Sequence, residues 1–183
     1  IVVANQGLEL MKSIVGSIKR VVVDLGGQFV NLAAKLERIE LSMGKIIGST
    51  KEGTKLFNQI LQFASTVPFE AEKLLEAGQN LLPILKGGKD ELKDWLSFIT
   101  DIAATTNLTL QETTSNFIKM YSAGAAAADL FRERGVLPLM GFTPGQEYTA
   151  SETRKRMKEI ANDTNSVFNR MAQIVASTWE GQV

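Results

Sequence analysis

The feature that most constrains the fold is a run of apolar residues, spaced by three and four positions, at the start of the chain. The run comprises Leu8, Met11, Val15, Ile18, Val22, Leu25, Phe29, Leu32, Leu36, Ile39, Met43 and Ile46. Heptad spacing of this kind keeps one apolar stripe of a helix facing a partner helix. It predicts a long coiled-coil-like helical arm over residues 1–47, and we expect the helix–helix contacts at Val15, Ile18, Val22, Leu25, Phe29, Leu32 and Leu36.

Two stretches of this arm allow other interpretations. Gly26 and Gly27 lie within the stripe, and each costs about 1 kcal/mol relative to alanine in a helix, so the sequence leaves open a kink there. Residues 39–47 alternate in part, with Ile39, Leu41 and Met43 on one side, which makes a short strand near 39–47 the alternative to the end of the helix.

Residues 48–148 have the texture of a compact block of short helices. Ser49 and Glu52 have the spacing of a capping box, which opens a helix over about residues 49–64. We expect Pro68 in the first turn of the next helix and Gly78 as its C-terminal cap. Further helices are predicted over residues 89–105, from a second capping box at Thr109, and in the alanine-rich stretch that ends before residue 135.

The last segment, residues 149–183, is predicted to form one long helix. It begins with a capping box at Thr149 and Glu152, and its apolar residues again step by three, four or seven positions. Thr164 occupies the position where an apolar residue would continue the stripe. The sequence therefore predicts an all-α chain in which two long heptad-patterned helices bracket a compact helical block.

Composition excludes several kinds of chemistry from the chain. It has no histidine and no cysteine, which removes Cys/His zinc sites, thiolate nucleophiles and Ser-His-Asp triads. Twenty basic residues balance twenty acidic ones, which argues against a dedicated nucleic-acid module. No apolar run is long enough for a transmembrane helix. The chain begins with Ile1 and shows no signal peptide, so we expect an internal fragment of a longer protein.

Short motifs in the chain have simpler explanations than catalysis. The segment 48–55 resembles a phosphate loop, but its threonine and lysine are in the wrong order, so we interpret it as a capped turn. The Ser42–Lys45 spacing matches that of penicillin-recognising enzymes by chance, because their other elements are missing. The acidic pairs Glu70 with Glu72 and Asp90 with Asp94 suit the first turns of helices.

The basic cluster formed by Arg154, Lys155, Arg156 and Lys158 surrounds Met157 on the last helix. Glu152 and Glu159 interrupt it, so a solvated helix face is favoured over a surface for nucleic acid or membranes.

An ordered series of short blocks resembles the conserved helical region in the N-terminal part of phage and prophage tail tape-measure proteins. The blocks are Gly48-Ser49, residues 61–70 ending in Thr66-Val67-Pro68-Phe69-Glu70, Ala77-Gly78, residues 96–107, residues 121–124, Asp129-Leu130, and Arg134-Gly135-Val136-Leu137-Pro138. They extend over roughly residues 36–180. The chain departs from the family pattern at residues 81–88, which add Pro83 and a Gly-Gly pair, and at Ala125, where the family often has a basic residue.

The resemblance implies a structural protein that lies in the lumen of the virion tail and determines tail length, and that is in the host cytoplasm during assembly. Its implied partners are further copies of itself, the tail tube and tail-assembly proteins, without specific nucleic acid and without a membrane span in this fragment. We expect no catalytic residue, cofactor or metal site. The alternatives are a histidine-independent glycosidase that uses two carboxylates and a helical protein-binding adaptor, which would show, respectively, a pocket with paired carboxyl groups and an exposed apolar groove.

Overall fold

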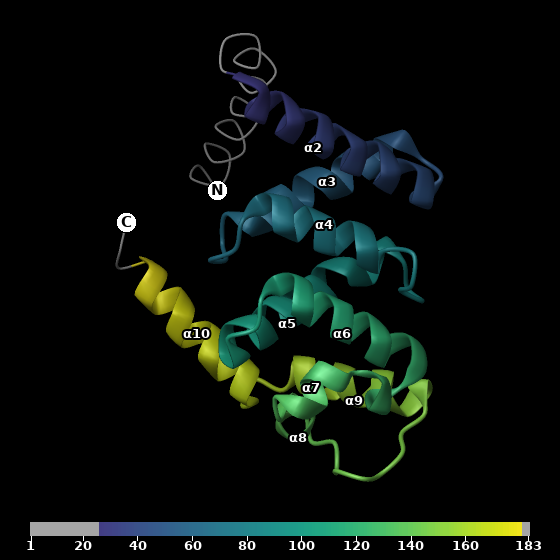
Figure 1. The fold of residues 1–183 in the computed structure, drawn as a ribbon, viewed down its shortest axis with the longest axis vertical. Helices are drawn as coiled ribbons and strands as arrows, with labels where there is room; N and C mark the ends of the chain where they lie inside the picture. The colour runs from purple at the N-terminus through teal and green to yellow at the C-terminus, as the bar shows by residue number, and fades with distance from the viewer. Residues whose placement is uncertain (1–25, 181–183) are drawn as a thin grey trace.

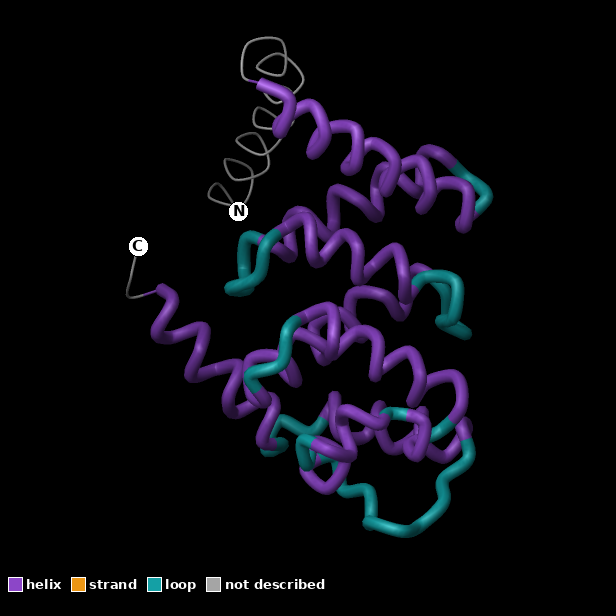
Figure 2. The backbone as a smooth tube through the Cα atoms, viewed as in Figure 1, coloured by secondary structure: helices purple, strands orange, loops and turns teal. Residues whose placement is uncertain are grey.

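The computed structural model describes residues 26–180, and these form an all-helical stack (Figures 1 and 2). In chain order the helices are α2 (Gly26–Ile47), α3 (Thr50–Ala64), α4 (Ala71–Leu81), α5 (Lys89–Thr106), α6 (Leu110–Ala123), the 3₁₀ turn η1 (Ala125–Ala127), α7 (Asp129–Glu133), α8 (Val136–Leu139), α9 (Ala150–Asn162) and α10 (Val167–Glu180). Successive helices follow one another along the long axis, from α2 and α3 at one end to α7, α8 and α9 at the other.

The expected arm is described only in its C-terminal half. Residues 1–25 lie outside the described part of the chain, and α2 extends from Gly26 to Ile47. Helix α2 ends at the same residue as the predicted arm, Ile47. The alternative of a short strand near 39–47 is wrong, because α2 continues through this stretch and buries Ile39 and Met43 against the core. The alternation seen in the sequence arises because Leu41 falls on the solvent face, where it is 51% exposed.

Three glycines shape the contact between α2 and α3. Helices α2 and α3 are joined by a tight turn at Gly48, whose φ of 79° is in the left-handed region. The backbones then cross so closely that a Cβ added at Gly53 would lie less than 3.0 Å from the Cα and N of Gly44. The Gly44–Gly53 contact thereby lets α2 and α3 pack side by side.

The core extends through the whole stack and includes a group of aromatic residues that contact one another. Trp95 of α5 lies 5.2 Å from Phe117 and 5.8 Å from Tyr121 of α6, measured between ring centroids. Phe98 of α5 meets Phe168 of α10 edge-on at 5.8 Å. The same continuous core includes Met43 of α2. The three segments predicted from the sequence, residues 1–47, 48–148 and 149–183, therefore all contribute side chains to one core.

The predicted single C-terminal helix is wrong, because the chain breaks between α9 and α10. Asp163 leaves the helical conformation, and its carboxylate accepts the backbone N–H of Asn165 at 2.9 Å. The hydroxyl of Ser166 then accepts the N–H of Asn169 at 3.2 Å, as the N-cap of a new helix. Short polar side chains at 163–166 satisfy the backbone locally, so the helix ends here although its apolar spacing continues. Helix α10 then packs against α5.

Helix ends elsewhere follow the capping signals in part. The boxes at Thr109 and Thr149 are both present with reciprocal hydrogen bonds. Pro68 precedes α4, which begins only at Ala71, so its predicted place in the first turn is wrong. Gly78 does not end α4, because it is buried inside the helix, where an added Cβ would lie 2.7 Å from Ile60 Cδ1. The alanine-rich stretch forms the 3₁₀ turn η1 and the short helix α7 instead of one helix.

Candidate functional site

Only some of the stripe residues predicted to make helix–helix contacts lie in the described part of the chain. Val15, Ile18, Val22 and Leu25 lie outside the described residues. Phe29 belongs to α2, and Leu32 and Leu36 are half-buried on the same helix. Leu36 packs against the core that contains Ile39 and Met43. From Leu36 to Met43, the stripe is therefore occupied by packing within the chain, whereas its last residue, Ile46, is exposed.

An ion pair also holds α2 against α4. The ammonium of Lys35 contacts the carboxylates of both Glu72 and Glu76. Hydrogen bonds to these two carboxylates raise the pKa of Lys35, and the bond from Lys35 lowers the pKa of Glu76. Glu72, one of the carboxylates considered for acid–base chemistry, is thus engaged in a structural contact.

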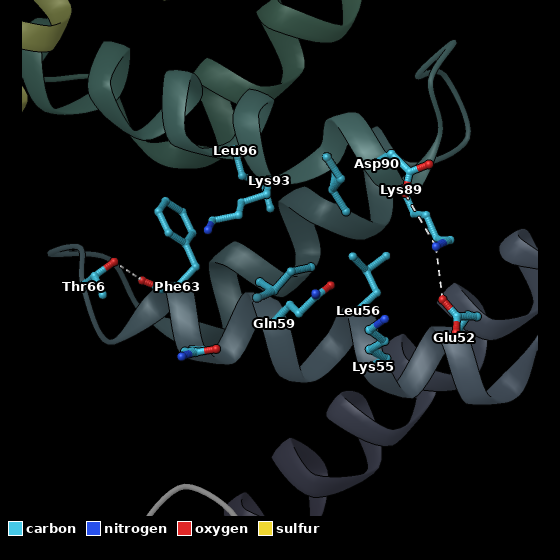
Figure 3. Close-up of a pocket in the computed structure, with 13 residues that line it drawn as sticks. Glu52, Lys55, Leu56, Gln59, Phe63, Thr66, Lys89, Asp90, Lys93 and Leu96 are labelled. Carbon is cyan, nitrogen blue, oxygen red and sulfur yellow. Dashed lines mark hydrogen bonds and ion pairs between the residues drawn. The ribbon is translucent and has the colours of Figure 1, made fainter. Parts of the chain in front are cut away.

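A groove between α3 and α5 is a concave site with an apolar base in the described part of the chain (Figure 3). Its volume is about 480 Å³. The base contains the apolar residues Leu56, Ile60, Leu92 and Leu96, which are between 0 and 5% exposed. Half-buried Phe63 forms one end beside Thr66. The groove therefore joins a closed aliphatic base to a wall with an accessible aromatic ring.

Lysines dominate the rim of this groove. Lys55 projects from α3, and Lys89 and Lys93 project from α5. Lys89 bridges Glu52 at 3.1 Å and Asp90 at 3.6 Å. A hydrogen bond from Lys89 lowers the pKa of Glu52, and Lys55 adds to this effect through its charge without forming an ion pair. Within residues 26–180, neither Lys55 nor Lys93 has an ion-pair partner. The rim thus presents two ammonium groups that form no ion pair within the described residues.

The two acidic residues that line the groove can be compared with the paired carboxyl groups of a glycosidase. Such an enzyme needs one carboxyl group whose pKa is raised and which can act as an acid. Glu52 and Asp90 share Lys89 as their partner, and the pKa of Glu52 is lowered instead. Burial does raise the pKa of the Asp101 carboxyl, from 3.8 to about 7, but Asp101 is not among the residues that line the groove.

The basic cluster on α9 is largely engaged inside the molecule. Arg154 donates to the carbonyl oxygen of Tyr121 at 2.7 Å, and its guanidinium lies over the same tyrosine ring. Arg156 donates to the carbonyl oxygen of Gly141. Lys158 binds Glu91 at 2.5 Å. Three of the four basic residues therefore fix α9 to its neighbours, a role that their sequence spacing did not reveal.

A second, more polar depression of about 550 Å³ lies between α4 and α6. Its lining includes Lys73, Glu76, Asn80, Gln111 and Lys119, with Ala77 and Ile118 as the apolar members. Within residues 26–180, no group of three or more acidic side chains is placed to hold a metal ion. Because the depression has only two apolar lining residues, we take the groove between α3 and α5 as the candidate binding site.

The fold and this groove define an all-helical domain with an amphipathic surface groove. Comparison of the chain with protein-family models, with curated proteins and with solved structures gives no match in any of the three. Among the described helices, none combines the length and the apolar character needed to cross a membrane.

Proposed function

We propose that the chain is a structural domain of a phage or prophage tail tape-measure protein, which contributes to tail assembly and tail-length determination through helical association. In this role it acts without catalysis, in the lumen of the virion tail and, during assembly, in the host cytoplasm. Its partners are further copies of the chain, the tail tube and tail-assembly proteins.

One structural observation carries this proposal: the residues behind the family resemblance occupy positions that shape the fold. Gly48, Gly124 and Gly135 have φ values of 79°, 103° and 70°, which favour glycine. Gly78 lies where α4 meets Ile60 of α3, and the block that ends in Pro68-Phe69-Glu70 forms the turn before α4. A family signature that reflects a shared fold should concentrate at such turns and helix crossings, which supports the resemblance.

Helical association follows from the sequence pattern. A helix rises about 1.5 Å per residue, so a helical protein is a ruler whose length scales with its residue number. A heptad stripe keeps several copies in register. Because the chain's own core covers the stripe from Leu36 to Met43, we assign the contacts between copies to its earlier part, at Val15, Ile18, Val22, Leu25, Phe29 and Leu32.

The groove between α3 and α5 favours a second candidate, a helical protein-binding adaptor. An adaptor needs an accessible concave surface with apolar and charged groups, and this groove supplies one. The two candidates differ in self-association, because an adaptor functions as a monomer whereas the tape-measure role requires contacts between copies.

Sedimentation of the 183-residue chain tests the proposed association. We expect its sedimentation coefficient to increase with concentration, and we expect Val15→Asp combined with Val22→Asp to abolish the increase, because charged groups would enter the apolar stripe. Ser13→Asp combined with Ser17→Asp is the matched control, because these residues lie off the stripe. A chain that stays monomeric at millimolar concentration contradicts the proposal and favours the adaptor.

The biological role is tested in a phage or lysogen that encodes the chain. In-frame removal of residues 26–180 should abolish complete tails or change their length, as measured by electron microscopy. Tails of normal number and length would refute a tape-measure role, whatever the result of sedimentation.

A further inference from the structure

We propose that the groove between α3 and α5 docks an amphipathic, acidic helix of a partner protein. This inference rests on the proposed role of the chain as an assembly domain, because such a domain needs a surface that recognises another component. It assigns that surface to defined residues and specifies the chemistry of the segment that binds there.

The shape of the groove suits a helix. Leu56, Ile60 and Phe63 lie at positions i, i+4 and i+7 of α3, so they form one row along that helix. Leu92 and Leu96 lie at i and i+4 of α5 and form the opposite row. Two such rows leave a linear channel between them, and a third helix can lay its apolar face into a channel of this kind.

The charges on the rim determine which charge we expect on the partner helix. Glu52 and Asp90, the acidic residues among the lining groups, are both within 4.0 Å of Lys89. Lys55 on one wall and Lys93 on the other have no ion-pair partner within residues 26–180. Carboxylates on both sides of a docked helix would therefore find an ammonium on each wall, whereas a basic helix would place like charges together.

The exposure of the base favours a helix over a small apolar ligand. Leu56, Ile60, Leu92 and Leu96 are already 95% or more buried, so a small ligand would remove little further apolar surface from water. A helix gains additional area from Phe63, which is only half-buried, and from the aliphatic stems of the lysines along both walls. Its affinity would therefore come from the rim as well as the base.

Nuclear magnetic resonance of the full 183-residue chain, labelled with ¹⁵N, tests the proposal. The probe is a synthetic amphipathic peptide of about 18 residues, with leucines at steps of three and four and glutamates beside them. We expect saturable chemical-shift changes in α3 and in the first half of α5. A matched peptide with lysine in place of every glutamate should bind at least about tenfold more weakly, because its charges would face Lys55 and Lys93.

Charge reversal on the rim provides the decisive variant. Lys55→Glu combined with Lys93→Glu should weaken the acidic peptide and strengthen the basic one. The matched control is Lys45→Glu combined with Lys155→Glu, which makes the same change of net charge at exposed positions on α2 and α9, away from the groove. Thermal unfolding of both variants, compared with the parent chain, verifies that each is folded.

Several outcomes would overturn the inference. These are the absence of shifts at millimolar peptide, shifts confined to other helices, or equal binding by the rim variant. If octanoate changes the chemical shifts of the groove amides and the peptide does not, the site binds a small anion. If the rim variant abolishes self-association, the groove binds a second copy of the chain. Val15→Asp with Val22→Asp changes none of the residues that line the groove, so peptide binding by that variant separates failure of the groove from failure of the proposed association.

Discussion

Replacing Gly53 by alanine tests whether the close approach of α2 and α3 controls stability. In an isolated helix this change should stabilise by about 1 kcal/mol, because alanine has the higher helix propensity. In the folded chain the added Cβ would lie less than 3.0 Å from the Cα and N of Gly44, well inside the 3.4 Å at which ordinary contact begins. These are backbone atoms of another helix, so no side-chain rotation can relieve the contact.

The net effect of Gly53→Ala follows from these opposing terms. Forcing extra atoms into a packed site costs about 1–3 kcal/mol or more, and backbone atoms on the other side place this site at or above the upper end. After the propensity gain, we expect the free energy of unfolding to fall by about 2 kcal/mol. For a chain of this size, that corresponds to a decrease in Tm of about 4–8 °C.

Urea unfolding measured by circular dichroism gives the free energy directly, provided that the m value is unchanged. Gly44→Ala should cost less than Gly53→Ala, because its Cβ would lie 3.2 Å from the nearest backbone atom, Thr50 Cα. Asn58→Ala is the control on the exposed face of α3, where only propensity acts and stability should rise by up to about 0.7 kcal/mol. Stabilisation by Gly53→Ala, as large as or larger than that of the control, would refute the reasoning.

Three further substitutions test buried and charged contacts. Because burial raises the pKa of Asp101, the folded chain keeps a proton that the unfolded chain has already lost, so stability should fall as the pH rises from about 4 to 7. Asp101→Asn should therefore raise the Tm at pH 8 but not at pH 3.5. An equal effect at both pH values would contradict this. The pKa of Glu91 is lowered chiefly by the hydrogen bond from Lys158, so Glu91→Gln should reduce the free energy of unfolding at neutral pH. This loss of stability should disappear in acid, where Glu91 is protonated in the parent chain as well. A loss of stability that persists at pH 2.5 in urea titrations would count against the ion pair. The hydroxyl of fully buried Thr153 accepts a hydrogen bond from the N–H of Ala125 at 3.0 Å. The isosteric Thr153→Val should therefore lower the free energy of unfolding in urea by about 1–3 kcal/mol. A decrease under about 0.5 kcal/mol would show that this hydrogen bond is dispensable.

The sequence predicted the helical elements well where local signals were complete. The capping boxes at Thr109 and Thr149 fix helix starts through hydrogen bonds between residues three positions apart, so neighbouring residues suffice to predict them. At Ser49 only half of the box forms, because its partner Glu52 binds Lys89 from a different helix. All three helix starts were therefore predictable from neighbouring residues, whereas the partner of the Glu52 side chain depended on a residue distant in the sequence.

The candidate site was less accessible to sequence reasoning. Leu56, Ile60, Leu92 and Leu96 are typical core positions of two amphipathic helices, and nothing in their spacing says that α3 and α5 leave a groove between them. The exposed lysines along these helices likewise look like any solvated face. A signal for the chain break at 163–166 was present in its four consecutive polar residues, but the continuing apolar spacing outweighed it.

By itself the sequence determined the all-helical class, most helix starts, and the excluded histidine and cysteine chemistry, because these depend on composition and on contacts within a few residues. Only the tertiary structure decided which face of each helix is covered, that Gly53 and Gly78 serve helix crossings, and that lysines from α3 and α5 line one groove. The physical reason is that burial and charge pairing depend on which residues meet across the fold, and the periodicity of one helix does not specify its neighbour.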